Sequence, residues 1–90
     1  MITVKLPTIL RKHAGDQPEV RADGETLGAV LDTLEERYPG LTLGIRGEDG
    51  ALRRHVNVYL NGEDVRYLGS LDAPVGDGDT IAILPAVAGG

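Results

Sequence analysis

The sequence predicts a single α+β roll in which one main helix covers one face of a mixed sheet of four or five strands. Short segments near both chain ends and around residue 58 alternate apolar and polar residues, which indicates strands, whereas residues 26–38 alone repeat at helical spacing. A chain of 90 residues also has room for only one hydrophobic core. We therefore expect one domain over residues 1–84 and a flexible tail over residues 85–90.

Two strands open the predicted fold. Ile2, Val4 and Leu6 alternate with polar residues, as a half-buried strand requires. Residues 11–16 are polar and predict a loop, and residues 19–22 predict a second short strand. This order favours a β-hairpin.

The main helix has clear limits in the sequence. Thr26 is a suitable N-cap, and Pro39 with Gly40 ends the pattern, because proline disfavours helical geometry in the residue before it. Apolar residues recur at steps of three and four, as in an amphipathic helix: Leu27, Val30, Leu31, Leu34 and Tyr38.

The second half of the chain predicts a surface excursion followed by a hairpin. Residues 41–54 are rich in glycine, and we expect one short strand there, at residues 43–45. Residues 56–60 alternate as a strand, and Asn61-Gly62 is a strong signal for a tight turn. We expect the return strand at residues 65–67.

The last predicted elements lead to the tail. Residues 68–74 are irregular, with one helical turn expected among them. Asp77-Gly78-Asp79 predicts a tight turn into a closing strand over residues 80–84. Asp77 and Asp79 lack the further spaced oxygen ligands of a calcium loop, so we interpret them as turn residues.

Composition and charge exclude several classes of function. The net charge of -5 repels phosphate backbones, and no basic stripe offsets it, so we expect no nucleic-acid partner. The absence of cysteine excludes disulfides and cysteine nucleophiles. The N-terminal residues lack the unbroken apolar stretch of a signal peptide, and no segment is long and apolar enough for a membrane span. We expect a cytoplasmic protein with no membrane partner.

Candidates for a catalytic or metal site within the domain are weak. His13 and His55 are the only histidines and lie in different segments, so neither a metal site nor a catalytic triad is indicated. No glycine-rich loop ends in the Lys-Ser/Thr pair that phosphate binding needs. We therefore predict that the protein is not an enzyme and binds no cofactor, and that any ATP is bound by a partner.

The tail is the strongest candidate site. Pro85 cannot donate to a sheet ladder, so regular structure is expected to stop there. An extended tail from Pro85 would reach roughly 20 Å, far enough to enter a partner's cleft. Val87, Ala88 and Gly89 are small enough for a narrow channel, and Gly90 presents an unhindered carboxylate.

The strand alternation also predicts a docking surface. With Val56, Val58 and Leu60 facing the helix, Tyr59 lies on the open face of the sheet, and Leu84 lies there too. Exposed apolar side chains beside a tail are natural anchors for a partner, unless a loop covers them.

Several motifs together resemble the MoaD/ThiS family of ubiquitin-like sulfur carriers, most closely its CysO-type carriers of cysteine biosynthesis. The resemblance covers nearly the whole chain, and it implies the β-grasp fold. The motifs that carry it are Pro7-Thr8-Ile9-Leu10-Arg11, Thr26-Leu27-Gly28-Ala29-Val30, Val56-Asn57-Val58-Tyr59, Glu63-Asp64-Val65-Arg66, Asp77-Gly78-Asp79-Thr80 and Ile83-Leu84-Pro85-Ala86-Val87-Ala88-Gly89-Gly90.

The resemblance implies a mechanism that uses the C-terminal carboxylate. An E1-like adenylating and sulfurtransferase enzyme would convert Gly90 to an acyl adenylate and then to a thiocarboxylate. In the CysO branch, a PLP-dependent cysteine synthase would accept the sulfur, and a Zn-dependent peptidase would release the cysteine. Four alternatives stay open: a MoaD-like subunit of molybdopterin synthase, a protein modifier joined to lysines, a plain interaction domain and, last, an intrinsic enzyme.

Overall fold

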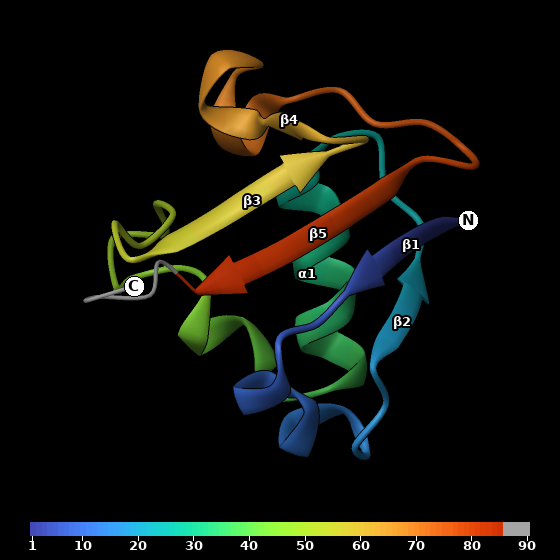
Figure 1. Ribbon diagram of the computed structural model, residues 1–90, viewed down its shortest axis with the longest axis vertical. Coiled ribbons are helices and arrows are strands. Elements are labelled where there is room, and N and C mark those ends of the chain that lie inside the picture. Colours follow the sequence, from blue (N-terminus) through green and yellow to red (C-terminus); the bar gives the residue numbers. More distant parts are fainter. Residues whose placement is uncertain (86–90) are drawn as a thin grey trace.

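The computed structural model describes residues 1–85 and shows a five-stranded sheet with one α-helix across one face (Figure 1). The strand order is β2-β1-β5-β3-β4, which places the last strand of the chain in the middle of the sheet. The α+β prediction of a mixed sheet with one main helix is confirmed.

The first two strands form the predicted antiparallel pair. β1 (Ile2–Lys5) pairs with β2 (Glu19–Ala22), and Val4 lies opposite Val20. The segment between them is not the polar loop that the sequence predicted over residues 11–16. It forms a 3-10 helix, η1 (Thr8–Ala14), in which Leu10 and Ala14 are buried in the core while Lys12 and His13 stay exposed.

The main helix is close to its predicted limits. α1 (Leu27–Arg37) begins after Thr26, whose hydroxyl accepts a hydrogen bond from the Ala29 N–H at 3.2 Å. The inward face is fully buried and packs on the sheet: Leu27, Val30, Leu31 and Leu34. Gly40 adopts a positive φ of 93°, which lets the chain reverse directly after the helix.

The short strand predicted at residues 43–45 is wrong. That segment belongs largely to a 3-10 helix, η2 (Leu41–Gly44). The N–H groups at its start bond to the preceding helix: the Glu35 carboxylate accepts from the N–H of Gly40 at 2.7 Å and from the N–H of Thr42 at 3.1 Å. Leu41 is fully buried at the end of α1, so the segment packs on the helix and does not join the sheet.

The hairpin after β3 (Val56–Leu60) turns as predicted, but its return strand is shorter and earlier. Asn61 and Gly62 both have positive φ, 50° and 90°, as in a two-residue type I′ turn. This turn places Leu60 opposite Glu63, so β4 (Glu63–Asp64) starts at once and residues 65–67 are not a strand.

Short 3-10 turns follow the hairpin. The Asp64 side chain accepts from the Arg66 N–H at 2.9 Å and starts η3 (Val65–Tyr67), which buries Val65 in the core. The helical turn predicted within residues 68–74 is confirmed as η4 (Ser70–Asp72).

The closing strand β5 (Thr80–Pro85) runs parallel to β1 and antiparallel to β3. It extends one residue further than expected, to Pro85. Ile81 and Ile83 face the helix and are almost completely buried. The central strand is therefore fixed on both edges, and it leads directly into the predicted tail.

Candidate functional site

The structure describes the base of the tail. Gly90, Gly89, Ala88 and Val87, the predicted reactive and channel residues, lie outside the described residues. The base is the end of β5, where Leu84 pairs with Asn57 and Pro85 pairs with Val56. The last described residues are therefore still paired in the sheet, at the end of its central strand.

The sheet register explains why proline is accepted at this position. The Asn61 N–H donates to the Thr80 carbonyl at 2.9 Å, which sets the phase of the ladder between β3 and β5. Because hydrogen-bonded and non-hydrogen-bonded pairs alternate, the pair of Val56 and Pro85 is a non-hydrogen-bonded one. On the other edge, the pairing of β1 ends at Lys5, opposite Ala82. Neither neighbouring strand needs an N–H from Pro85.

Arg66 braces the strand that faces the tail base. β4 is too short to reach Val56, and the Arg66 guanidinium takes its place: Nη2 donates to the Val56 carbonyl at 2.7 Å, and Nη1 donates to the Asn57 side-chain oxygen at 3.0 Å. Asp64 lies 3.7 Å from the same guanidinium. Sequence reasoning missed this role, because only the fold brings η3 beside the start of β3.

The open face of the sheet confirms the predicted alternation. Val56, Val58 and Leu60 are buried, and Leu84 is 48% exposed on the opposite face. Tyr59 is half-buried, so it is less exposed than the sequence predicted. Tyr59 lies two residues along β3 from Asn57, which pairs with Leu84, so these side chains share one face of the sheet. The structure thus brings both predicted docking residues together near the tail base.

A small apolar pocket lies at the same end of the sheet, and the sequence did not predict it. Its volume is about 120 Å³, and it is lined by Pro7, Ile9, Leu10, Gly44, His55, Val56 and Ile83. Ile9 on η1 and Leu43 on η2 stay 64% and 67% exposed. An apolar pocket with the exposed Ile9 side chain at its edge is suited to contact with another apolar group.

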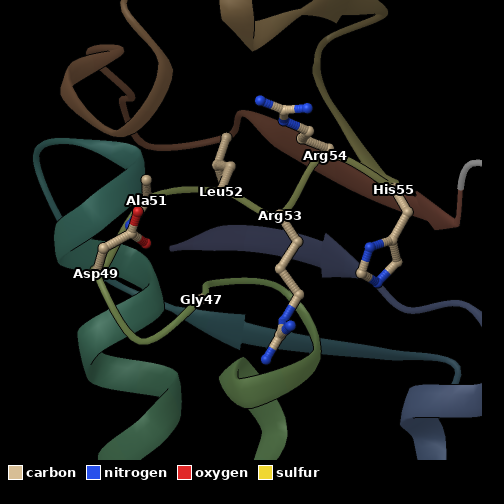
Figure 2. A pocket seen from close by; sticks show the side chains of 7 residues that line it. All are labelled: Gly47, Asp49, Ala51, Leu52, Arg53, Arg54 and His55. Atoms are coloured by element: carbon tan, nitrogen blue, oxygen red, sulfur yellow. The ribbon is translucent and has the colours of Figure 1, made fainter.

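A second, wider hollow of about 500 Å³ adjoins the first through His55 (Figure 2). Figure 2 shows the Arg53 and Arg54 side chains extending to opposite sides of the segment, with Asp49 at the far end. Arg53 Nε donates to the Leu43 carbonyl at 2.7 Å, so this cation is fixed against η2. Arg54 is exposed.

The remaining charged candidates have structural roles. The Asp79 carboxylate accepts from the Gly76 N–H at 2.8 Å and from the Asn61 amide at 3.1 Å, and these bonds lower its pKa. This geometry supports the interpretation of Asp79 as a turn residue. Within residues 1–85, no three His, Asp or Glu side chains are grouped so that they could hold a metal ion.

The family model described as "ThiS family" matches residues 4–90, which is nearly the whole chain. The chain belongs to the ThiS family. The predicted resemblance to ubiquitin-like sulfur carriers of the MoaD/ThiS type is confirmed.

Two relatives are similar to this chain over almost their full length. The sulfur carrier protein CysO of Mycobacterium tuberculosis is 50% identical over 91 residues, which cover 99% of this chain and 98% of that protein. Small archaeal modifier protein 1 of Haloferax volcanii is 40% identical over 88 residues, with 96% and 97% covered.

Solved structures agree with this assignment. A chain in the crystal structure of the Amycolatopsis orientalis BexX/CysO complex superposes with a TM-score of 0.94 at 49% identity, with 100% of both chains covered. The β-grasp fold is thereby confirmed, and the protein is a ubiquitin-like sulfur carrier. In the described part of the chain, no helix is long and apolar enough to cross a membrane.

Proposed function

We propose that this carrier acts as a protein co-substrate, whose sulfur is held as a thiocarboxylate on Gly90. The observation that carries the proposal is the match to CysO, which continues over almost the entire chain. The description of CysO as a sulfur carrier protein names the cargo, and Gly90 is the last residue of the sequence.

Elementary chemistry explains why the carboxylate must be activated. A carboxylate oxygen of Gly90 attacks the α-phosphorus of ATP on an activating enzyme, and pyrophosphate leaves. Sulfide then attacks the acyl carbon, the C–S bond forms, and the bond to AMP breaks. Gly90 suits both steps because it carries no side chain that would hinder the approach to its carbonyl carbon.

We further propose that cysteine biosynthesis receives the sulfur. The thiocarboxylate sulfur would add to the β-carbon of an aminoacrylate held by a PLP-dependent cysteine synthase, which gives a thioester. Transfer of the acyl group from sulfur to the cysteine nitrogen would give an amide, and a Zn-dependent peptidase would hydrolyse it to release cysteine and the Gly90 carboxylate. The identity of 50% with CysO supports this branch. We propose the cytoplasm as the compartment of this reaction.

A second candidate function is protein modification. It is favoured by the 40% identity to small archaeal modifier protein 1, which also spans almost the full chain. In that role, a lysine amine in place of sulfide would attack the Gly90 adenylate. The two functions share the activation step and differ in the nucleophile.

Docking of the activating enzyme is proposed on the open sheet face. Leu84 is exposed directly before the tail, and Tyr59 lies beside it in the register, half-buried. Val87, Ala88 and Gly89 would then pass through the channel of the enzyme toward its ATP site.

The test is conversion of the full chain by an activating enzyme with ATP and sulfide, followed by intact mass measurement. We expect one oxygen to be replaced by sulfur, with the change located on Gly90 by fragmentation. A variant lacking Gly90 serves as the control and should remain unconverted. A wild-type chain that stays unchanged under conditions that convert a known carrier would refute the proposal.

A further inference from the structure

Resting on the proposed function, we propose that the pocket between η1, η2 and the end of β5 is a second docking site for the activating enzyme. It would accept an aliphatic side chain on an acidic segment at the mouth of that enzyme's cleft. This site lies on the helix side of the strand end, apart from the open face that carries Leu84 and Tyr59.

The shape of the pocket indicates an aliphatic guest. Apart from His55, the side chains that line it are apolar, and they include Leu10 of η1, Val56 of β3 and Ile83 of β5. A volume of about 120 Å³ is close to that of one branched aliphatic side chain. Gly44 keeps the wall open on the η2 side, because a Cβ there would lie 2.7 Å from Leu10 Cδ2 and press Leu10 inward.

The surroundings of the pocket show that it is open to a partner. Ile9 and Leu43 are among the most exposed large apolar residues of the described chain. Ile9 lines the pocket from η1, and Leu43 precedes the lining residue Gly44 on η2. These two 3-10 helices contact each other below the end of β5 (Figure 1). Two exposed aliphatic residues beside an apolar pocket form a continuous surface that would gain by burial.

Charge defines the chemistry of the partner. The chain is acidic as a whole, with a net charge of -5, but two segments that supply lining residues of this pocket carry only positive charge. Neighbouring elements contribute two carboxylates: Glu19 lies opposite Lys5 on β2, and Glu35 accepts hydrogen bonds from the N–H groups of Gly40 and Thr42 beside η2. Neither residues 5–12 nor residues 53–56 contain an acidic residue. The cations in these segments form no salt bridge among residues 1–85, and they are Lys5, Arg11, Lys12, Arg53 and Arg54.

Acidic groups gather at the opposite end of the sheet. Asp77 contacts the amino group of Met1 at the start of β1, and Asp79 bonds to Asn61 in the hairpin turn. A partner that approaches with its acidic surface forward is therefore attracted at the tail base and repelled at the far end. This polarity orients the tail toward the cleft of the enzyme.

The experiment measures ATP–pyrophosphate exchange by the activating enzyme as a function of carrier concentration, with full-length variants. Ile9→Ser removes an apolar side chain at the pocket, and Arg54→Glu reverses a charge next to the lining residue His55. Tyr67→Ser and Arg21→Glu make the matched changes at exposed positions away from the pocket and serve as controls. Thermal unfolding of each variant checks that the fold is retained.

We expect each of the two surface variants to raise the KM for the carrier by about tenfold and the double variant by about a hundredfold, with kcat unchanged. The controls should leave KM within about twofold. Added salt should raise the KM of the wild-type chain and should affect Arg54→Glu much less.

Other outcomes would overturn the proposal. An unchanged KM in both surface variants, with normal exchange, refutes the second site and leaves the proposed function intact. A lowered KM in Ile9→Ser would indicate that the pocket binds the carrier's own tail and so competes with the enzyme for it. A wild-type dimer that Ile9→Ser dissociates in sedimentation would assign it to a second copy. The absence of exchange with the wild-type chain would refute the proposed function and this site with it.

Discussion

Replacement of Arg66 by Met should loosen the strand that faces the tail base. The change keeps much of the aliphatic stem but removes the guanidinium bonds to the Val56 carbonyl at 2.7 Å and the Asn57 side chain at 3.0 Å. Hydrogen bonds of a charged group stabilise by about 1.5–3 kcal/mol each when they are shielded from water. The Arg66 side chain is 36% exposed, so water replaces part of this interaction. We expect a net loss of about 1.5 kcal/mol in the free energy of unfolding.

For a domain of this size, that loss corresponds to a decrease in Tm of roughly 8 °C. Thermal unfolding followed by circular dichroism measures it, and urea titration gives the free energy directly. Arg54→Met is the matched control, because Arg54 is exposed and makes no hydrogen bond within the described residues. Equal Tm values for Arg66→Met and the wild-type chain, or an equal loss in the control, would refute the bracing role.

Three further predictions concern the helix, its end and the open sheet face. Gly24→Ala should lower the free energy of unfolding by about 1–3 kcal/mol, because the added Cβ would lie 2.7 Å from the Val30 backbone nitrogen. Denaturant titration measures this loss, and Gly76→Ala is the control, because the nearest atom to its added Cβ is 4.0 Å away. Bonds from the Thr42 hydroxyl and the Gly40 N–H hold the pKa of Glu35 below its ordinary value. The stabilising effect of the Glu35 carboxylate is therefore present above the pKa of the unfolded chain and is lost as the pH falls through the lowered pKa of the folded chain. Glu35→Gln should accordingly lose stability relative to the wild-type chain at neutral pH, and the difference should shrink in acid. Leu84→Ser should raise the KM of the activating enzyme for the carrier by about tenfold without lowering Tm, and an unchanged KM would contradict docking on the open face.

Long periodic segments could be predicted from the sequence because burial repeats along them. The alternation of Val56, Val58 and Leu60 and the three- and four-residue steps of α1 each report which side faces the core. Asn61-Gly62 specified its turn for a local reason, since both residues accept positive φ.

Short elements could not be predicted in this way. η1 buries only Leu10 and Ala14, and η2 depends on the Glu35 carboxylate of the preceding helix, so neither has a period that a local pattern could reveal. The return strand lies earlier than the sequence predicts, because the two-residue turn makes pairing begin at Glu63, and Val65 packs in the core as part of η3.

The same distinction between local and distant contacts applies to the candidate site. Leu84 and Gly90 could be proposed from the last strand and the chain end alone. The Arg66 brace and the pocket under η1 and η2 require residues distant in sequence to meet, as Ile9 and Val56 do. Such contacts exist only once the sheet order is known.

The central claim is that Gly90 carries sulfur, and the most direct test is the intact mass of the protein recovered from its own cells. Rapid isolation under conditions that preserve thiocarboxylates should show a population in which one terminal oxygen is replaced by sulfur, located on Gly90 by fragmentation. A chain recovered only with an unmodified carboxylate while sulfur transfer is active, or only as conjugates joined through Gly90 to lysines, would contradict the account.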